Sequence, residues 1–121
     1  MSNFALSELA KLDGFIAVTL VDTEVGMSMA SEGSTATDPE MNAVAATEVY
    51  RSMTKAIDLL QLNDKIEDTL VSLGDTYQLI RPLHANPKLV IHLAMRRAQS
   101  NLALARRALS DFESSHDFSV L

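Results

Sequence analysis

The chain has 121 residues, about the size of one domain, and its 47% hydrophobic and 21% charged residues are typical of a globular protein. Its formal net charge of −6 argues against DNA or RNA as the main partner, because affinity for a polyanion comes largely from neutralising phosphates. The chain contains no cysteine, which excludes disulfides and thiolate metal sites.

We expect a cytoplasmic protein that has no membrane partner. The N-terminus lacks the basic and then apolar segments of a secretory signal, and the longest apolar run, residues 15–21, is too short to span a bilayer. The small polar segment 31–38 is too short to separate domains. We therefore predict one domain over residues 1–121, with a core at about 3–113 and a frayed tail at 114–121.

A short helix and two strands are predicted first. Ser2 can cap a helix that ends at about Leu12, before Gly14, which is free to adopt a positive φ. Residues 15–22 are apolar at both odd and even positions, which predicts a strand covered on both faces. Residues 27–32 alternate methionine with serine and predict a half-buried strand that forms a hairpin with the first.

A long helix is predicted over residues 39–62. Asp38 is a suitable N-cap, Pro39 fits the first helical position, and Glu40 complements the helix dipole. At 1.5 Å per residue the helix would be about 35 Å long, enough to cross a whole sheet. Thr47 is expected on its polar side. The apolar positions, which fall in an arc of about 140°, are Ala45, Ala46, Val49, Tyr50, Met53, Ala56, Ile57 and Leu60.

Three more strands are predicted at residues 65–73, 76–83 and 88–95, separated by turn signals at Gly74–Asp75 and in segment 84–87. Pro82 lacks an N–H and is best tolerated near a strand end or edge. The last strand is mostly apolar on both faces, with His92 among its inner positions.

A final helix is predicted from about Leu102 to Glu113, with Ser100 or Asn101 as its cap. Its apolar arc contains Leu102, Leu104, Ala105, Ala108, Leu109 and Phe112. The order αββαβββα predicts an α+β fold, in which a central five-stranded antiparallel sheet has helices on both faces.

This layout resembles the Roadblock family, named for dynein light chains, in a minimal form of bacterial type. The resemblance lies in "DGFIAVTLVDTEVGMSMAS", the long helix after "DPEM", "IEDTLVSLGDTYQLIRPL" and "NLALARRAL", and it covers about residues 3–113. It implies a Roadblock/profilin-like fold and a non-enzymatic interaction module. Such modules form homodimers or heterodimers that bind or regulate small Ras-like GTPases, or act as scaffolds.

The resemblance also implies a dimer in which two sheets join through their third strands and the long helices pack together. Independently, a third strand at the sheet edge, residues 66–73, would have unpaired backbone groups that a second copy could pair in a two-fold contact. Glu67 and Asp68 would partly guard this edge. The candidate interface residues are Tyr50, Met53, Ile57, Leu60, Ile66, Asp68 and Leu70.

No catalytic, cofactor-binding or metal-binding set of residues is predicted. The sequence lacks GxSxG, GxGxxG and GxxxxGK[ST], so we expect neither an enzyme nor a GTPase. The three histidines are too widely spaced for a zinc site, and His92 is expected to be partly buried and hydrogen-bonded. Glu67 and Asp68 are neighbours on a predicted strand, where they would point to opposite faces and could not form an acid/base pair.

Arg106 and Arg107 lie on the polar face of the last helix, as a solvated surface or as a contact patch for an acidic partner protein. A second interpretation of the whole chain is a PAS- or profilin-like sensor of a small ligand, which would need a pocket lined by methionines. Four methionines on predicted apolar faces are expected to fill the core, with an adaptable interface as the alternative: Met27, Met29, Met53 and Met95.

Overall fold

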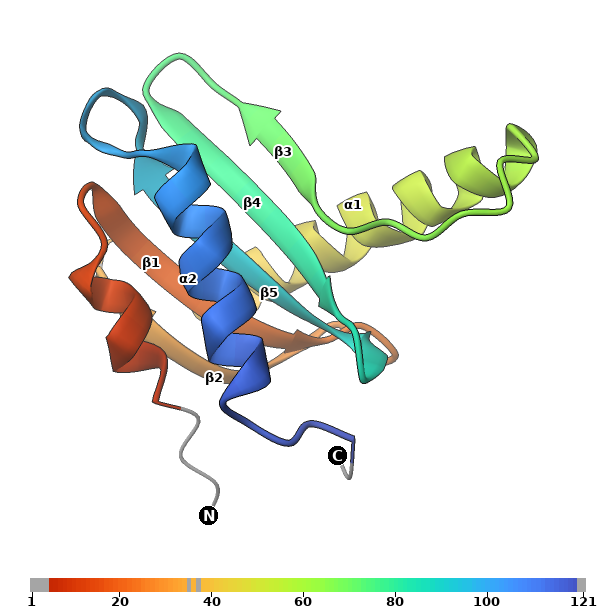
Figure 1. The fold of residues 1–121 in the computed structure, drawn as a ribbon, viewed down its shortest axis with the longest axis horizontal. Coiled ribbons are helices and arrows are strands. Elements are labelled where there is room, and N and C mark those ends of the chain that lie inside the picture. Colours follow the sequence, from red (N-terminus) through yellow and green to blue (C-terminus); the bar gives the residue numbers. More distant parts are fainter. Residues whose placement is uncertain (1–4, 35, 37, 120–121) are drawn as a thin grey trace.

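The strands form one antiparallel sheet in the order β2-β1-β5-β4-β3 (Figure 1). The computed structural model describes residues 5–34, 36 and 38–119. The elements, in chain order, are η1 (Leu6–Lys11), β1 (Phe15–Asp22), β2 (Met27–Gly33), α1 (Pro39–Leu59), β3 (Thr69–Ser72), β4 (Thr76–Leu83), β5 (Asn86–Arg96), η2 (Arg97–Gln99) and α2 (Leu102–Ser114). The predicted five-stranded α+β fold is confirmed.

Two hairpins meet at the centre of the sheet. β1 pairs with β2, β4 pairs with both β3 and β5, and the β1–β5 ladder joins the two groups, with Val18 opposite Leu93 and Leu20 opposite Ile91. Every residue of β5 from Leu89 to Met95 is buried, because helices cover the sheet on both sides. The prediction that this strand is covered on both faces is therefore confirmed.

The two faces of the sheet carry different helices (Figure 1). α2 and η1 lie on one face, and α1 lies on the other. The larger core cluster joins η1, α2 and one face of the sheet and consists of Leu6, Leu9, Val18, Leu20, Leu79, Leu83, Leu89, Ile91, Leu93, Met95, Ala105, Leu109, Phe112 and Phe118. The smaller cluster lies under α1 and consists of Val21, Ala43, Ala46, Ile80 and Val90.

Both long helices begin at the predicted caps. The Asp38 carboxylate accepts a hydrogen bond from the Glu40 N–H at 3.0 Å, and the Asn101 side chain accepts one from the Leu104 N–H at 3.1 Å. α1 ends at Leu59, three residues before the predicted end. None of the helices among residues 5–34, 36 and 38–119 is long and apolar enough to cross a membrane.

The buried stripe of α1 differs from the predicted one. Ala43, Ala46 and Thr47 are its buried residues, whereas Ala45 is exposed. The Thr47 hydroxyl donates to the Ala43 carbonyl at 2.7 Å, so its burial leaves no unpaired polar group. The prediction of Thr47 on the polar side is therefore wrong. Leu104 of α2 is likewise exposed, while Ala105, Leu109 and Phe112 are buried.

The ends of the fold also differ from prediction. The first helix is a 3-10 helix from Leu6 to Lys11, and the predicted cap Ser2 lies outside the described residues. Gly14 has the predicted positive φ, 79°. The expectation of a frayed tail is wrong at Phe118, which is 1% exposed and packs against Phe112 with ring centroids 5.8 Å apart. The Asn86 side-chain amide also donates to the Phe118 carbonyl at 2.9 Å.

Candidate functional site

The second half of α1 extends beyond the sheet. Its buried residues end at Thr47, and Figure 1 shows the helix passing behind the segment that leads into β3 and continuing past this edge strand. A helix that leaves its sheet exposes the apolar side chains that would otherwise be buried. The exposed apolar residues in and just after this part of the helix are Met53, Leu59, Leu60 and Leu62. We call them the overhang.

The edge beside the overhang is formed by β3, the outermost strand on this side. β3 has only four residues, so the prediction of a strand beginning at Ile66 is wrong, and Ile66 and Asp68 lie in the segment before it. In an antiparallel ladder, every second residue of a strand points its backbone N–H and C=O toward the same neighbouring strand. The Leu73 N–H donates to the Thr76 carbonyl, so Thr76 and every second residue after it along β4, up to Pro82, point toward β3. If the ladder continued, Pro82 would be paired with Glu67. Pro82 has no N–H to donate, so the ladder stops before it.

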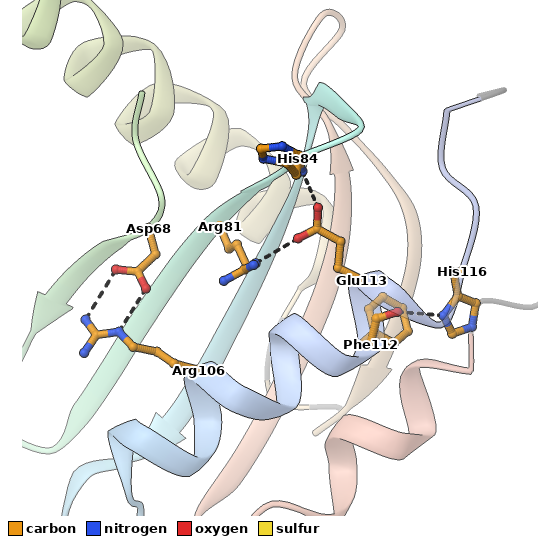
Figure 2. A network of polar contacts seen from close by, with 7 residues as sticks. All are labelled: Asp68, Arg81, His84, Arg106, Phe112, Glu113 and His116. Carbon is orange, nitrogen blue, oxygen red and sulfur yellow. Dashed lines mark hydrogen bonds and ion pairs between the residues drawn. The ribbon is translucent and has the colours of Figure 1, made fainter. Parts of the chain in front are cut away.

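Asp68 is bound instead by the last helix. Arg106 Nε lies 2.9 Å from Asp68 Oδ2, and Arg106 Nη2 lies 3.3 Å from Oδ1, so the guanidinium holds both carboxylate oxygens (Figure 2). These hydrogen bonds raise the pKa of Arg106. The Asp68 side chain is 12% exposed and that of Arg106 43%. The structure thus joins Asp68, a residue of the predicted dimer interface, to Arg106, which was predicted to contact a partner protein.

A second, more deeply buried ion pair lies about two turns further along α2. Arg81 Nε of β4 lies 3.0 Å from Glu113 Oε1, with side chains 15% and 11% exposed. The other Glu113 oxygen accepts a hydrogen bond from the backbone N–H of His84 (Figure 2). Arg106 and Glu113 are seven residues apart and therefore lie on one stripe of the helix. Sequence reasoning missed this pair because Arg81 and Glu113 are distant in the chain.

A groove of about 720 Å³ lies at the end of β4, where β3 no longer pairs with it. Its walls come from the second half of α1, from segment 64–67, from the end of β4 and from the end of α2. Tyr50, Ile57 and Ile66, three of the candidate interface residues, line it, and no methionine does. The methionine-lined pocket expected of a small-ligand sensor is therefore not this groove.

The methionines have a different distribution from the predicted one. Met95 is 1% exposed and fills the core, whereas Met27, Met29 and Met53 are exposed. The prediction of core filling is wrong for these three, because β2 is an edge strand and the second half of α1 has no sheet beneath it.

The described residues contain no group of three or more His, Cys, Asp or Glu side chains that could hold a metal ion. The adjacent carboxylates Glu67 and Asp68 do not converge on one site, since Asp68 is bound by Arg106 while Glu67 is exposed.

Known structures identify the architecture, although no family model matches the sequence and no curated protein does. A Roadblock/LC7 domain from Streptomyces avermitilis is similar, with a TM-score of 0.80 at 12% identity over 93% of this chain and 90% of that one. Myxococcus xanthus MglB has a TM-score of 0.74 at 14% identity, over 90% and 82%. An MglB with a tetrameric arrangement has a TM-score of 0.74 at 12% identity, over 91% and 80%. This chain has the Roadblock fold.

Within this Roadblock fold, the predicted interface residues fall into two groups. Met53 and Leu60 are exposed, and Leu60 directly follows the end of α1 that extends beyond the sheet. Leu70 packs against the core on the α2 side, so the neighbouring Val71, which sequence reasoning missed, is the β3 residue that faces the α1 side. The other candidates, which are partly buried, are Tyr50, Ile57, Ile66 and Asp68.

One titratable group lies inside the Roadblock sheet. His92 of β5 is 8% exposed, and its Nε2 lies 2.6 Å from Gln78 Oε1. The Gln78 amide nitrogen donates to Thr76 Oγ1, which turns the amide oxygen toward His92 and places the ring proton on Nε2. Burial lowers the pKa of His92 from 6.5 to about 4. The predicted hydrogen-bonded histidine is therefore confirmed.

Proposed function

We propose that this chain is a non-enzymatic interaction module that forms a dimer and binds a small Ras-like GTPase, as its regulator or as a scaffold. The observation that carries the dimer is the overhang, four exposed apolar side chains next to the open edge of β3. Apolar surface of this kind at a sheet edge favours association, because both the side chains and the strand's backbone groups gain partners.

A two-fold contact satisfies both features at once. Two β3 strands that pair antiparallel would continue the sheet from one copy to the next. Each α1 would then extend over the neighbouring sheet, where Val71 and the rest of the β3 and β4 surface could receive Leu59 and Leu60. The MglB with a tetrameric arrangement supports self-association on this fold.

The dimer is tested by light scattering after gel filtration at micromolar concentration. We expect the native chain to elute at twice its 13.2 kDa mass and the Leu60→Asp variant to elute as a monomer, since a charge would be buried in the interface. Leu104→Asp is the matched control, because Leu104 is similarly exposed on α2, away from this edge. A native chain that remains monomeric would overturn the dimer.

The GTPase partner rests on the Roadblock resemblance and on the Roadblock fold. Arg107 is exposed on α2 and remains a proposed contact, whereas Arg106 already holds Asp68. We would incubate the tagged protein with native lysate containing excess GDP or a non-hydrolysable GTP analogue, and identify captured proteins by mass spectrometry. A GTPase whose recovery depends on the nucleotide, and falls with Arg107→Glu, is the expected result. Failure to recover one in either condition would leave a scaffold role.

The absence of enzymatic activity is part of the same proposal, as is a cytoplasmic location. Support comes from the sequence, which lacks the nucleophile, phosphate-loop and dinucleotide motifs and has no cysteine. The net charge of −6 supports a protein partner over a nucleic acid. Retention of labelled single-stranded or duplex DNA in a filter-binding assay at low salt would contradict this part of the proposal.

A further inference from the structure

Four of the five methionines that the structure describes have exposed side chains. Met53 is 36% exposed and belongs to the candidate dimer interface, whereas Met27, Met29 and Met41 are 39 to 62% exposed and lie elsewhere in the fold. The chain contains no cysteine, so methionine provides the sulfur that an oxidant can reach. Oxidation of Met53 would therefore act on the surface through which we propose that two copies pair.

Met53 continues the stripe of α1 that packs on the sheet. The stripe has positions three or four residues apart, which share one side of a helix, and it consists of Ala43, Ala46, Tyr50, Met53, Ile57 and Leu60. Its first two residues are buried in the smaller core cluster under α1. Met53 is the first exposed residue of the stripe, and Leu60 at its end is 64% exposed. The side of α1 that covers the sheet thus becomes exposed at Met53.

Met53 also lies beside the open edge of the sheet. It lines a hollow between α1 and the chain leading into β3, together with Ile57, Ile66 and Thr69. Thr69 is the first residue of β3, the edge strand. A second copy that pairs its own β3 with this strand would continue the sheet beneath the exposed part of the stripe. The Met53 side chain would then pass from water into an apolar contact.

We propose that Met53 is a modification site, at which oxidation of the thioether by hydrogen peroxide prevents the chain from pairing with a second copy. This inference rests on the dimer proposed above. In the reaction, the Met53 sulfur attacks one peroxide oxygen, the O–O bond breaks and a sulfur–oxygen bond forms. The second oxygen leaves as water with both hydrogens of the peroxide. The sulfur is oxidised by two electrons to the sulfoxide, and the peroxide is reduced.

The sulfoxide opposes association because it makes the side chain polar. In the single chain, water hydrates the new oxygen, and Lys65, which lines the same hollow, is a donor close to it. In the dimer the oxygen would lie against apolar side chains and lose its hydration, which costs free energy. The oxidant reaches Met53 in the unpaired chain, where the side chain is 36% exposed. The modification therefore accumulates as copies dissociate, and it keeps them apart.

The other exposed methionines lie outside the proposed contact and serve as internal controls. Met27 and Met29 belong to β2, which is the edge strand at the far side of the sheet from β3. Met41 is in the first turn of α1, and at 100° per residue it lies about 120° around the helix from Met53. Oxidation at these three positions is expected to leave the dimer intact.

The test measures self-association by light scattering over a range of concentrations, before and after treatment with hydrogen peroxide. Mass spectrometry of peptides follows the oxidation of each methionine. Once Met53 is oxidised, the native chain should associate at least about tenfold more weakly, as expected for a polar group at an apolar contact. Met53→Leu, which is apolar, similar in size and inert to peroxide, should remain dimeric after the same treatment. Met41→Leu is the matched control and should dissociate like the native chain.

Two further measurements separate the modification from damage to the fold. Met53→Gln, a polar side chain of similar length at an exposed position, should weaken the dimer without any oxidant. Methionine sulfoxide reductases should restore the dimer of the oxidised native chain. A native chain that is monomeric before oxidation would overturn the dimer and this inference together. A dimer that survives complete oxidation of Met53, dissociation of oxidised Met53→Leu, or a Met53 that resists peroxide while Met41 reacts would overturn this inference alone.

Discussion

The free energy of unfolding should fall steeply below pH 6.5, because the His92 side chain is buried in the sheet in its neutral form. His92 is 8% exposed on the α1 face of β5, and its Nε2 lies 2.6 Å from the acceptor oxygen of Gln78. A second proton would make the ring a cation, which burial in the sheet beside Thr19 of β1 disfavours. Burial therefore lowers the pKa of His92 from 6.5 to about 4.

The sign and size of the effect follow from this shift. The unfolded chain takes up a proton on His92 near pH 6.5, whereas the folded chain resists it until about pH 4. Stability is thus fully present above pH 6.5 and is lost as the pH falls toward 4, by about 3 kcal/mol in total. Most of that loss occurs above about pH 4.5, where the majority of ordinary carboxyl groups are still ionised.

The assay is urea unfolding at several pH values between 7.5 and 4.5, with His92→Gln as the test variant. Glutamine can still donate to Gln78 but does not titrate, so its free energy of unfolding should be nearly constant across this window. His84→Gln is the control, because His84 is exposed and should keep the native slope. Equal slopes for the native chain and His92→Gln, or a His92 ring that titrates near pH 6.5 by NMR, would refute the reasoning.

Four further substitutions, measured by urea unfolding, compare buried with exposed interactions. Phe118→Ala should cost about 3 kcal/mol because it removes a buried ring, and an unchanged midpoint would show that the tail does not stabilise the fold. Arg81→Ala should cost about 3 kcal/mol, because both side chains of its ion pair with Glu113 are largely buried. Arg106→Ala should cost less, because Arg106 is 43% exposed and water can reach Asp68 once the guanidinium is removed. The reverse order would contradict this ranking. Asn101→Ala should cost about 1 kcal/mol, and no loss would deny its capping role.

The sequence was sufficient to predict those helices and strands whose patterns and caps involve residues close together in the chain. β5 was predictable because both its odd and even positions are apolar, and that pattern requires cover on two faces. The starts of α1 and α2 were predictable because Asp38 and Asn101 bond to backbone groups only two and three residues away. The order of these elements was then enough to indicate the five-stranded sheet.

The features that sequence reasoning missed depend on partners far along the chain. β3 begins at Thr69, directly after Asp68, whose carboxylate is bound by Arg106, and its ladder with β4 ends before Pro82, which has no N–H to donate. Thr47 is buried because its hydroxyl bonds within the helix, which hydropathy does not register. Phe118 is one aromatic residue in a polar tail, and its burial depends on Phe112 and Asn86.

The candidate site was predictable in type but not in detail. An acidic chain without catalytic motifs already pointed to protein binding, and Met53 and Leu60 proved to be exposed. The exposure of Met27 and Met29 could not be read from their alternation, because a half-buried strand and an edge strand share this pattern. Only the strand order places β2 at an edge.

The ladder at the centre of the sheet also constrains how the chain reaches its folded state. Phe15 pairs with Met95 and Asp22 with Leu89, so the partners are 80 and 67 residues apart along the chain. Contacts this distant must overcome the entropy of closing a long loop, and sheets that depend on them fold slowly. During synthesis, β1 and β2 emerge early but cannot be covered until β5 follows. We therefore expect the nascent chain to stay open, and dependent on protection from aggregation, until nearly all of the sheet has left the ribosome.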